Sequence, residues 1–384
     1  MTRGDLERDF ERFKREFPPD IAGHVRDAYG IDLSARYLGV PLPHPIGKGS
    51  GQLSLNAGQL EEDAAAGLAF VVLKTVIAED AAGTQSMSAW AIHETKMKVE
   101  HREAADGRQG WTVTWKGRGW DRTLAEYMTL VRAGRALHAS TGMPAIPSVK
   151  YHLPKLAEPF HEAEYQFTTG RLAEAWGTPP LLVEVDFSPT LAGDRLADDR
   201  AQIIRWLSEI PGRIRAASPM PVRIAVKLMN ARFDDAFQLE MMDACADADT
   251  LVCFNRLFDA ERGVAYGGWE LSERNLRVLD AFTIRPSAHP PIRRLSGTGN
   301  IHVGRLIAEY ALRGCESVQL HTFFQLPLSE YPATEGSRTR RALHKLIFDP
   351  GDGLVAAMLD LERRGRLERR NGMLHFLDLA RHAD

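Results

Sequence analysis

From residue 35 onward the chain alternates between short apolar runs and longer amphipathic stretches. Short, nearly continuous apolar runs are typical of buried parallel strands, and apolar positions spaced three or four apart predict helices. The runs predict strands at 46–49, 70–75, 145–150, 181–187, 222–228, 250–254, 292–296 and 317–321. The amphipathic stretches predict helices at 59–67, 124–141, 161–176, 198–217, 234–247, 271–282 and 302–313. This alternation favours an α/β fold of the closed (β/α)8 TIM-barrel type over an open doubly wound sheet.

Segments at both ends extend this barrel, which we expect to span residues 35–330. Residues 1–34 predict an N-terminal helical extension, in which Leu6, Phe10, Phe13 and Phe17 recur at helical spacing. The apolar stripe is narrow and the polar face mixes charges, which favours a packed helical cap over a membrane- or quinone-facing pair of helices. Residues 331–384 predict a C-terminal helical appendage that packs on the barrel.

Residues 76–122 are too long for one strand-to-helix connection and predict an insertion in the barrel. Loops of this length are usually functional lids or binding loops. The insertion carries Trp90, Trp111, Trp115 and Trp120, which could stack on a substrate ring. We therefore expect this insertion to be a functional lid or binding loop.

Composition excludes several classes of protein. The formal net charge of −3 over 384 residues gives no basic excess, so we expect no nucleic-acid partner. The three cysteines are far apart and the histidines are scattered, so no metal site is expected. The charged N-terminus lacks the apolar segment of a secretory signal, and no apolar run reaches the length of a membrane span. We expect a cytoplasmic enzyme with a small-molecule substrate and no membrane insertion.

Two turns near the C-terminus predict a phosphate site. The segment 292–304 reads IRRLSGTGNIHVG, a strand that ends in Gly-Thr-Gly-Asn before a helix, and the next strand ends at His321 and Thr322. Glycines let backbone N–H groups approach an anion closely, and a helix N-terminus adds the positive end of its dipole. In TIM barrels the loops after strands 7 and 8 frequently bind phosphate. The alternative is a pair of ordinary strand-to-helix turns.

Over about residues 32–325 the sequence resembles the dihydroorotate dehydrogenase family, an FMN-binding (β/α)8-barrel family. The phosphate region, SGTGNIHVGRLIAEYALRGCESVQLHTFF at 296–324, is the most specific part of this resemblance. The other matching segments are LSARYLGVPLPHPIGKGSG at 33–51, GLAFVVLKTV at 67–76, RIAVKLMNA at 223–231 and LVCFNRL at 251–257.

The resemblance implies FMN as cofactor and hydride transfer between flavin N5 and a small cyclic substrate. A reduced flavin carries negative charge at its N1/O2 edge, and a buried lysine there would stabilise that charge. The implied cofactor-binding residues are Ser50, Gly51, Lys74, Thr75, Lys227, Gly297, Thr298, Gly299, Asn300, His321 and Thr322. The implied substrate-binding residues are Asn56, Lys150, Thr190, Asn255 and Arg256. The family also commonly forms homodimers.

The catalytic segment departs from the family pattern. Ser188 matches the family's serine base, but the asparagine before it is an acid, Glu184 or Asp186, and the asparagine after it is Thr190. Side chains two apart on a strand share a face, so both acids could point into the barrel mouth and repel an anion such as dihydroorotate.

We therefore expect a substrate other than dihydroorotate, with an amine or hydroxyls that an acid can bind, and with Phe187 stacking on its ring. Asp186 rivals Ser188 as the base. The alternative for the acids is an internal salt bridge, for example with Lys150.

Three other functions stay open at this point. The chain could be a dihydroorotate dehydrogenase proper, or a flavin-free phosphate-binding lyase or isomerase in which Lys74 or Lys227 forms a Schiff base. It could also be a non-catalytic descendant of the family. No dinucleotide-binding GxGxxG motif occurs, so an electron donor or acceptor must reach the flavin directly or through a second protein.

Overall fold

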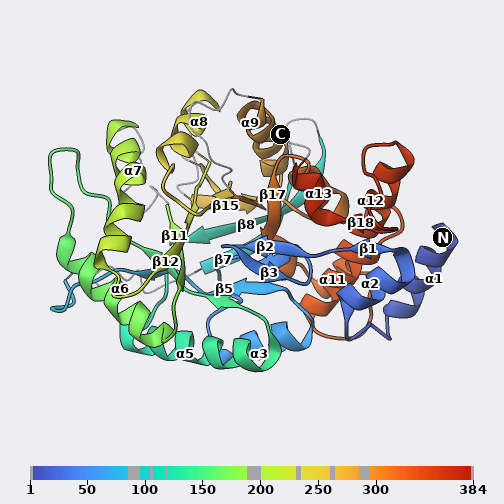
Figure 1. The fold of residues 1–384 in the computed structure, drawn as a ribbon, viewed down its shortest axis with the longest axis horizontal. Coiled ribbons are helices and arrows are strands. Elements are labelled where there is room, and N and C mark those ends of the chain that lie inside the picture. Colours follow the sequence, from blue (N-terminus) through green and yellow to red (C-terminus); the bar gives the residue numbers. More distant parts are fainter. Residues whose placement is uncertain are drawn as a thin grey trace.

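The computed structural model describes residues 3–84, 96–103, 107–116, 119–187, 200–230, 235–259, 264–284 and 294–381. In these residues a curled parallel sheet of ten strands lies at the centre, and helices cover its outer face (Figure 1). The strand order is β6-β10-β11-β12-β13-β16-β17-β4-β5-β9. The α/β class expected from the sequence is confirmed.

The strands of the sheet match the predicted apolar runs within about two residues. They are β4 (Ile46–Lys48), β5 (Phe70–Val72), β6 (Val76–Ile77), β9 (Ala145–Ile146), β10 (Ser148–Lys150), β11 (Leu181–Asp186), β12 (Val222–Lys227), β13 (Thr250–Cys253), β16 (Arg294–Thr298) and β17 (Cys315–Leu320). The predicted strand at 145–150 is divided in two, because Pro147, which has no N–H to donate to a ladder, separates β9 from β10. The predicted strand at 70–75 ends earlier, with β5 at Val72, and β6 follows outside the predicted run.

The helices around the sheet also follow the prediction. They are α3 (Ala57–Ala65), α5 (Leu124–Thr141), α6 (Glu162–Trp176), α7 (Arg200–Ala217), α8 (Asp235–Ala244), α9 (Leu271–Thr283) and α10 (Gly304–Ala311). Local signals fix their ends. Helix α5 begins with a capping box between Thr123 and Glu126, and it ends at Gly142 in the left-handed conformation.

The predicted insertion forms a second sheet that the apolar pattern did not indicate. Strands β7 (Lys96–Glu103) and β8 (Gln109–Lys116) pair antiparallel and join β15 (Val264–Gly268) and β14 (Leu257–Asp259), which follow β13. The sheet order is β14-β15-β8-β7. Two connections far apart in sequence thus build one wall beside the carboxyl ends of the parallel strands.

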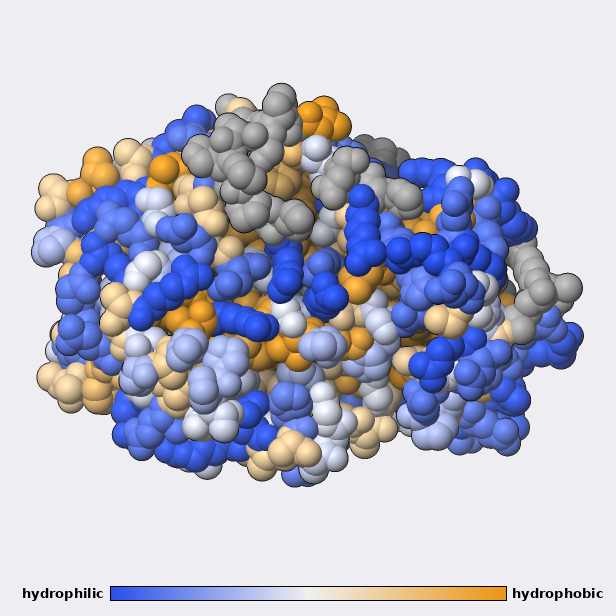
Figure 2. Space-filling model, viewed as in Figure 1, coloured by the Kyte–Doolittle hydropathy of each residue, from blue (hydrophilic) through white to orange (hydrophobic). Residues whose placement is uncertain are grey.

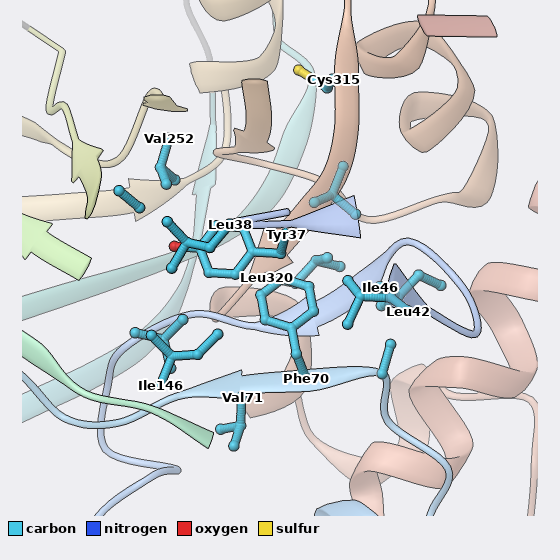
Figure 3. Close-up of a cluster of buried hydrophobic side chains, with 14 of the residues drawn as sticks. Tyr37, Leu38, Leu42, Ile46, Phe70, Val71, Ile146, Val252, Cys315 and Leu320 are labelled. Atoms are coloured by element: carbon cyan, nitrogen blue, oxygen red, sulfur yellow. The ribbon is translucent and has the colours of Figure 1, made fainter. Parts of the chain in front are cut away.

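A hairpin closes the opposite end of the parallel sheet. Strands β2 (Ala35–Tyr37) and β3 (Val40–Leu42) pair antiparallel near the amino ends of the parallel strands. Figure 3 shows Tyr37, Leu38 and Leu42 among apolar side chains from β4, β5, β9, β13 and β17. The rings of Tyr37 and Phe70 stack with centroids 4.7 Å apart. This end of the sheet is therefore filled by core side chains.

The N- and C-terminal segments pack on each other. At the right of Figure 1, helix α1 (Arg3–Phe13) packs on α11 (Arg338–Phe348), which in turn packs on α12 (Leu354–Arg363). Helix α2 (Ile21–Tyr29) contacts α11 through His24 and Phe348. Phe13 and Phe348 make an edge contact at 4.8 Å. Strand β1 (Ile31–Asp32) pairs with β18 (Leu374–His375), ahead of α13 (Phe376–Arg381). The apolar stripe of α1 is therefore covered by the chain itself, as the packed-cap interpretation predicts.

The surface in Figure 2 is mostly hydrophilic, with apolar residues in small separate areas. In the part of the chain that the structure describes, the exposed large apolar side chains are Leu156, Ile284 and Leu328, which belong to different segments. Among the described residues, no helix combines the length and apolar character that a membrane span requires.

Candidate functional site

One cavity lies at the carboxyl ends of the parallel strands. It holds about 920 Å³ of empty space, part of it open to solvent. Its lining comes from the turns after β4, β5, β13, β16 and β17 and from the last residues of β11 and β12. Met97, Val113 and Tyr266 of the antiparallel sheet form its side wall. Ligand sites of α/β proteins lie at this end of the strands, so this cavity is the candidate site.

The turn after β4 brings backbone close to the cavity because it contains glycines. A Cβ atom at Gly51 would lie 1.8 Å from Nε2 of His321, so a larger residue would have to displace that ring. Ser50 in the same turn shares a hydrogen bond of 2.7 Å with Thr75, and Thr75 shares one of 3.0 Å with the buried Ser148. These contacts hold two hydroxyl groups at the cavity wall.

A network of buried polar groups lies at the cavity floor. Lys227, at the end of β12, donates to Oε1 of Glu184 at 3.3 Å and to Oε1 of Gln319 at 3.2 Å. Gln319 Nε2 donates to Oε2 of Glu184 at 2.7 Å. Lys227 and Gln319 line the cavity, whereas Glu184 lies behind them. The site thus presents an ammonium group backed by a carboxylate.

A second ion pair lies on the cavity wall. Arg256 Nη2 contacts Oδ2 of Asp186 at 3.4 Å, and both residues line the cavity. Lys74, after β5, also lines it. Burial, and next the charge of Arg256, lowers the pKa of Lys74 from 10.5 to about 7. Its ammonium group is therefore only partly protonated near neutral pH.

His321, after β17, is a neutral group in this environment. Burial, followed by the charges of Lys74 and Lys227, lowers its pKa to about 3. Its Nε2 accepts a hydrogen bond of 3.3 Å from the amide of Gln52. Because an imidazole that accepts at one nitrogen is neutral, His321 can offer one hydrogen-bond donor but no positive charge.

The turn after β16 has the features of an anion site. Gly299 has φ +98° and Asn300 has φ +50°, and both line the cavity together with Ile301, Thr322 and Phe323. In the described part of the chain, the amides of Asn300 and Thr322 donate to no backbone or side-chain acceptor, whereas the pairing of Thr298 with Gln319 directs the Gly299 amide toward the Gln319 carbonyl. Backbone amides in a glycine-containing turn of this kind can form a concave donor surface suited to a phosphate group.

Two buried side chains fix the shape of this turn. Tyr310 of α10 donates its hydroxyl to the carbonyls of Thr298 and Gly299, both at 3.0 Å. Asn275 of α9 donates to the carbonyls of Phe254 and Thr298, at 3.0 and 2.7 Å. They hold the carbonyls of Phe254, Thr298 and Gly299, and so fix the backbone of the turn at the cavity wall.

The helix after this turn does not contribute as expected. We expected the N-terminus of α10 to add its dipole to the phosphate site. The first-turn amide of Arg305 instead donates to the carbonyl of Asp352 at 2.7 Å, and a Cβ at Gly304 would lie 2.0 Å from the carbonyl oxygen of Leu346. The turn after α11 therefore covers this helix end.

Most of the expected site residues meet at the cavity. Those that line it are Ser50, Gly51, Lys74, Thr75, Asp186, Lys227, Asn255, Arg256, Thr298, Gly299, Asn300, His321 and Thr322. Ser188 and Thr190 lie outside the described residues.

Four expected site residues do not line the cavity. Asn56 is exposed and caps α3, where it accepts from the amide of Gln59 at 3.0 Å. Lys150 ends β10 away from the lining, and Glu184 lies behind Lys227. Gly297 makes room for Tyr310, whose ring carbon would lie 2.5 Å from a Cβ there.

The aromatic residues expected to stack on a substrate ring have other partners. Trp120 is buried against Tyr127, and Trp111 donates to Oε2 of Glu330 at 3.0 Å. Phe187 is buried against Trp206. That expectation is wrong for these three residues, because each fills the core or ties the antiparallel sheet to the rest of the protein.

Sequence reasoning missed Gln319, Tyr310 and Asn275. Each is a polar residue inside an apolar strand or helix and is fully buried. A buried amide or hydroxyl needs a partner, so such positions are a signal of an internal network, although the sequence does not say which partner.

Comparison of the chain with protein-family models and with curated protein sequences gave no match. The function must therefore be argued from the site itself.

Proposed function

We propose that the protein is an FMN-dependent oxidoreductase similar to dihydroorotate dehydrogenases. The observation that carries the proposal is the positive-φ turn at Gly299 and Asn300, which lines a cavity with a buried lysine, Lys227, on its floor. A phosphate group and a ring that gains negative charge on reduction need these two features together.

We also infer that the parallel sheet is a closed (β/α)8 barrel. Strand β6 stands at one end of the strand order and β9 at the other. In the chain β6 follows β5, which pairs with β9, and β10 follows β9 and pairs with β6. The two ends of the order therefore belong to neighbouring, paired segments. The amide of Leu73 donates to the carbonyl of Ile146 at 2.8 Å beyond the end of β5, and β6 resumes the pairing. If β5 with β6, and β9 with β10, are each counted as one strand, eight strands close on themselves.

The residues present fit FMN. Thr298, Gly299, Asn300, His321 and Thr322 would hold the phosphate through backbone amides and neutral side chains. The ring would contact Ser50, Gly51, Thr75 and Lys227, which line the cavity together. The turn after β4 lies close to the lysine, because a Cβ at Gly49 would be 3.4 Å from the Lys227 Nζ. When bound, FMN supplies a ring that accepts or donates a hydride at N5.

The chain's own residues would bind and orient the substrate and move a proton. Asn255 and Arg256 offer donors at the cavity wall, and Arg256 holds the Asp186 carboxylate in place. Asp186 is a candidate base within the described residues, and Ser188 is the candidate that the family resemblance implies. The proton accepted by the base leaves from the substrate atom next to the one that loses hydride.

The substrate we propose is a small ring other than dihydroorotate, because the asparagines that the family uses are replaced around Glu184 and Asp186. Both acids are paired, with Lys227 and Arg256. Their repulsion of an anion is therefore weaker than unpaired acids would cause, which keeps dihydroorotate itself as a substrate to be tested.

The test is the absorption spectrum of the purified protein, followed by identification of the released cofactor and anaerobic reduction with candidate ring substrates. We expect a flavin spectrum, FMN on release, and bleaching by at least one cyclic substrate. A colourless protein that does not take up added FMN would contradict the proposal.

One observation favours a second candidate, a flavin-free lyase or isomerase. With a pKa of about 7, Lys74 is available as a neutral amine at physiological pH, as Schiff-base chemistry requires. Borohydride trapping of a carbonyl ligand on Lys74, located by peptide mass, would support this candidate over the flavin enzyme.

A further inference from the structure

Glu184 is buried beside the proposed flavin site but does not reach the cavity. Its side chain has no exposed surface, and it is the fourth residue of the fully buried strand β11. Lys227 and Gln319 stand between it and the cavity, and both contact it. A direct role in binding substrate is therefore excluded by its position, and the residue needs another explanation.

Glu184 accepts hydrogen bonds from three side chains. The carboxylate accepts from Lys227 at 3.3 Å, from Gln319 Nε2 at 2.7 Å and from the hydroxyl of Tyr37 at 2.7 Å. Tyr37 comes from the β2–β3 hairpin at the amino ends of the parallel strands, so its hydroxyl reaches Glu184 from the side opposite the cavity. These three donors fix the position of the carboxylate next to Lys227.

Tyr37 is a reliable donor in this network. Burial, together with the nearby charge of Glu184, raises its pKa well above the ordinary value for tyrosine. The phenol therefore stays protonated and donates a hydrogen bond to the carboxylate. Gln319 is held in one orientation, because its oxygen accepts from Lys227 while its nitrogen donates to Glu184.

We propose that Glu184 is a positioning residue that sets the redox potential of bound FMN through Lys227. The inference rests on the proposed function. A carboxylate in contact with the ammonium group cancels part of its field on the cavity side, so the lysine stabilises a negatively charged reduced ring less than it would alone. Tyr37 and Gln319 donate hydrogen bonds to the same carboxylate. Less of the negative charge of Glu184 therefore acts on Lys227, and the cancellation is smaller.

A merely structural ion pair would give a different result. If the pair only filled the interior, its loss would change stability but not the relative affinity of the protein for oxidised and reduced FMN. The potential of the bound flavin is therefore the deciding quantity, and turnover is not needed to measure it.

The main experiment compares the midpoint potential of FMN bound to the wild type, to Glu184→Gln and to Glu164→Gln, by anaerobic titration against a reference dye. Glu164 is a matched control, because it is a buried glutamate paired with His152 and lies outside the cavity lining. We expect Glu184→Gln to favour reduced FMN about tenfold, an upward shift of about 30 mV for a two-electron couple. Glu164→Gln should leave the potential unchanged.

A second variant tests the same idea with both charges in place. Tyr37→Phe removes one donor, so more of the carboxylate's charge acts on Lys227, and reduced FMN should be disfavoured about twofold. A raised potential in Glu184→Gln together with a lowered potential in Tyr37→Phe supports the proposal. A potential in Glu184→Gln that equals or lies below the wild-type value overturns the proposed role of Glu184, and so does an equal shift in Glu164→Gln. Either result leaves FMN binding itself untouched. If Glu184→Gln does not fold, an unchanged or raised potential in Tyr37→Phe overturns the proposed role.

Failure of the proposed function would look different. A wild-type protein that does not bind FMN overturns both the function and this inference, whereas the results above presuppose normal flavin binding by the wild type.

Discussion

The two ends of the parallel sheet are built from opposite kinds of residue. At the amino end the β2–β3 hairpin brings Tyr37, Leu38 and Leu42 into contact with apolar strand residues (Figure 3). At the carboxyl end the same strands stop at glycines, hydroxyls and charged groups around a cavity. The curled parallel sheet is therefore packed with side chains at one end and borders a cavity at the other.

This difference separates stability from function along each strand. Residues at the amino end bury apolar surface, whose loss destabilises the whole fold. Residues at the carboxyl end are held by backbone geometry and hydrogen bonds, and changes there should affect ligand binding first. Tyr37 belongs to both regions, because its ring stacks on Phe70 while its hydroxyl reaches Glu184.

The largest effect is expected at the amino end. Phe70→Ala removes a fully buried ring in contact with Tyr37 and should lower the free energy of unfolding by about 3–5 kcal/mol. Urea unfolding measures this loss, and titration of the folded variant should show FMN affinity close to the wild type. Unchanged stability with lost FMN binding would contradict the separation of the two ends.

At the carboxyl end, Gly299→Ala should weaken FMN binding about 30-fold, or about 2 kcal/mol. The residue has φ +98°, and a Cβ would lie 2.8 Å from the carbonyl oxygen of Phe254. Gly142→Ala is the matched control, since Gly142 also has positive φ, +80°, but no neighbour within 4 Å. Equal FMN affinities in the two variants, measured by fluorescence titration, would argue against the phosphate turn.

A pH dependence should arise from Lys74. Its pKa is about 7 in the folded protein against an ordinary 10.5, so between these values the unfolded chain holds a proton that the folded chain has released. The free energy of unfolding of the ligand-free protein should therefore rise with pH across this window, by at most about 1.4 kcal/mol per pH unit. Lys74→Met should remove this part of the slope, and identical pH profiles for both proteins would refute it.

The smallest effect is expected in the antiparallel wall. Trp111→Phe deletes the hydrogen bond to Glu330 and should lower the free energy of unfolding by about 1 kcal/mol. FMN affinity should change little, because Trp111 does not line the cavity. A large loss of FMN binding would show that this wall contributes directly to the site.

Much of the parallel sheet could be predicted because its strands are continuous apolar runs. Residues 181–187 and 222–228 predict β11 and β12 almost to the residue. The antiparallel sheet could not be predicted, since β8 pairs with β15, about 150 residues later in the chain. No local pattern specifies such a pairing, which depends on where the parallel strands end.

In the candidate site, the positions of the glycine-containing turns could be predicted from the sequence. The partners of individual polar side chains could not. Glycines after strands located the turns at Gly51 and Gly299. The sequence could not show that Glu184 would pair with Lys227, or that Asn56 would cap a helix. Alternation on β11 placed Glu184 and Asp186 on one face, but only Asp186, nearer the strand end, reaches the cavity.

The most direct test of the account is a comparison of FMN with riboflavin, which lacks the phosphate, in equilibrium titrations of the cofactor-free protein. The account predicts saturable FMN binding, with riboflavin at least about 100-fold weaker because the turns at Gly299–Asn300 and Thr322 lose the phosphate that they bind. Equal affinities for the two, or no binding of either, would contradict it.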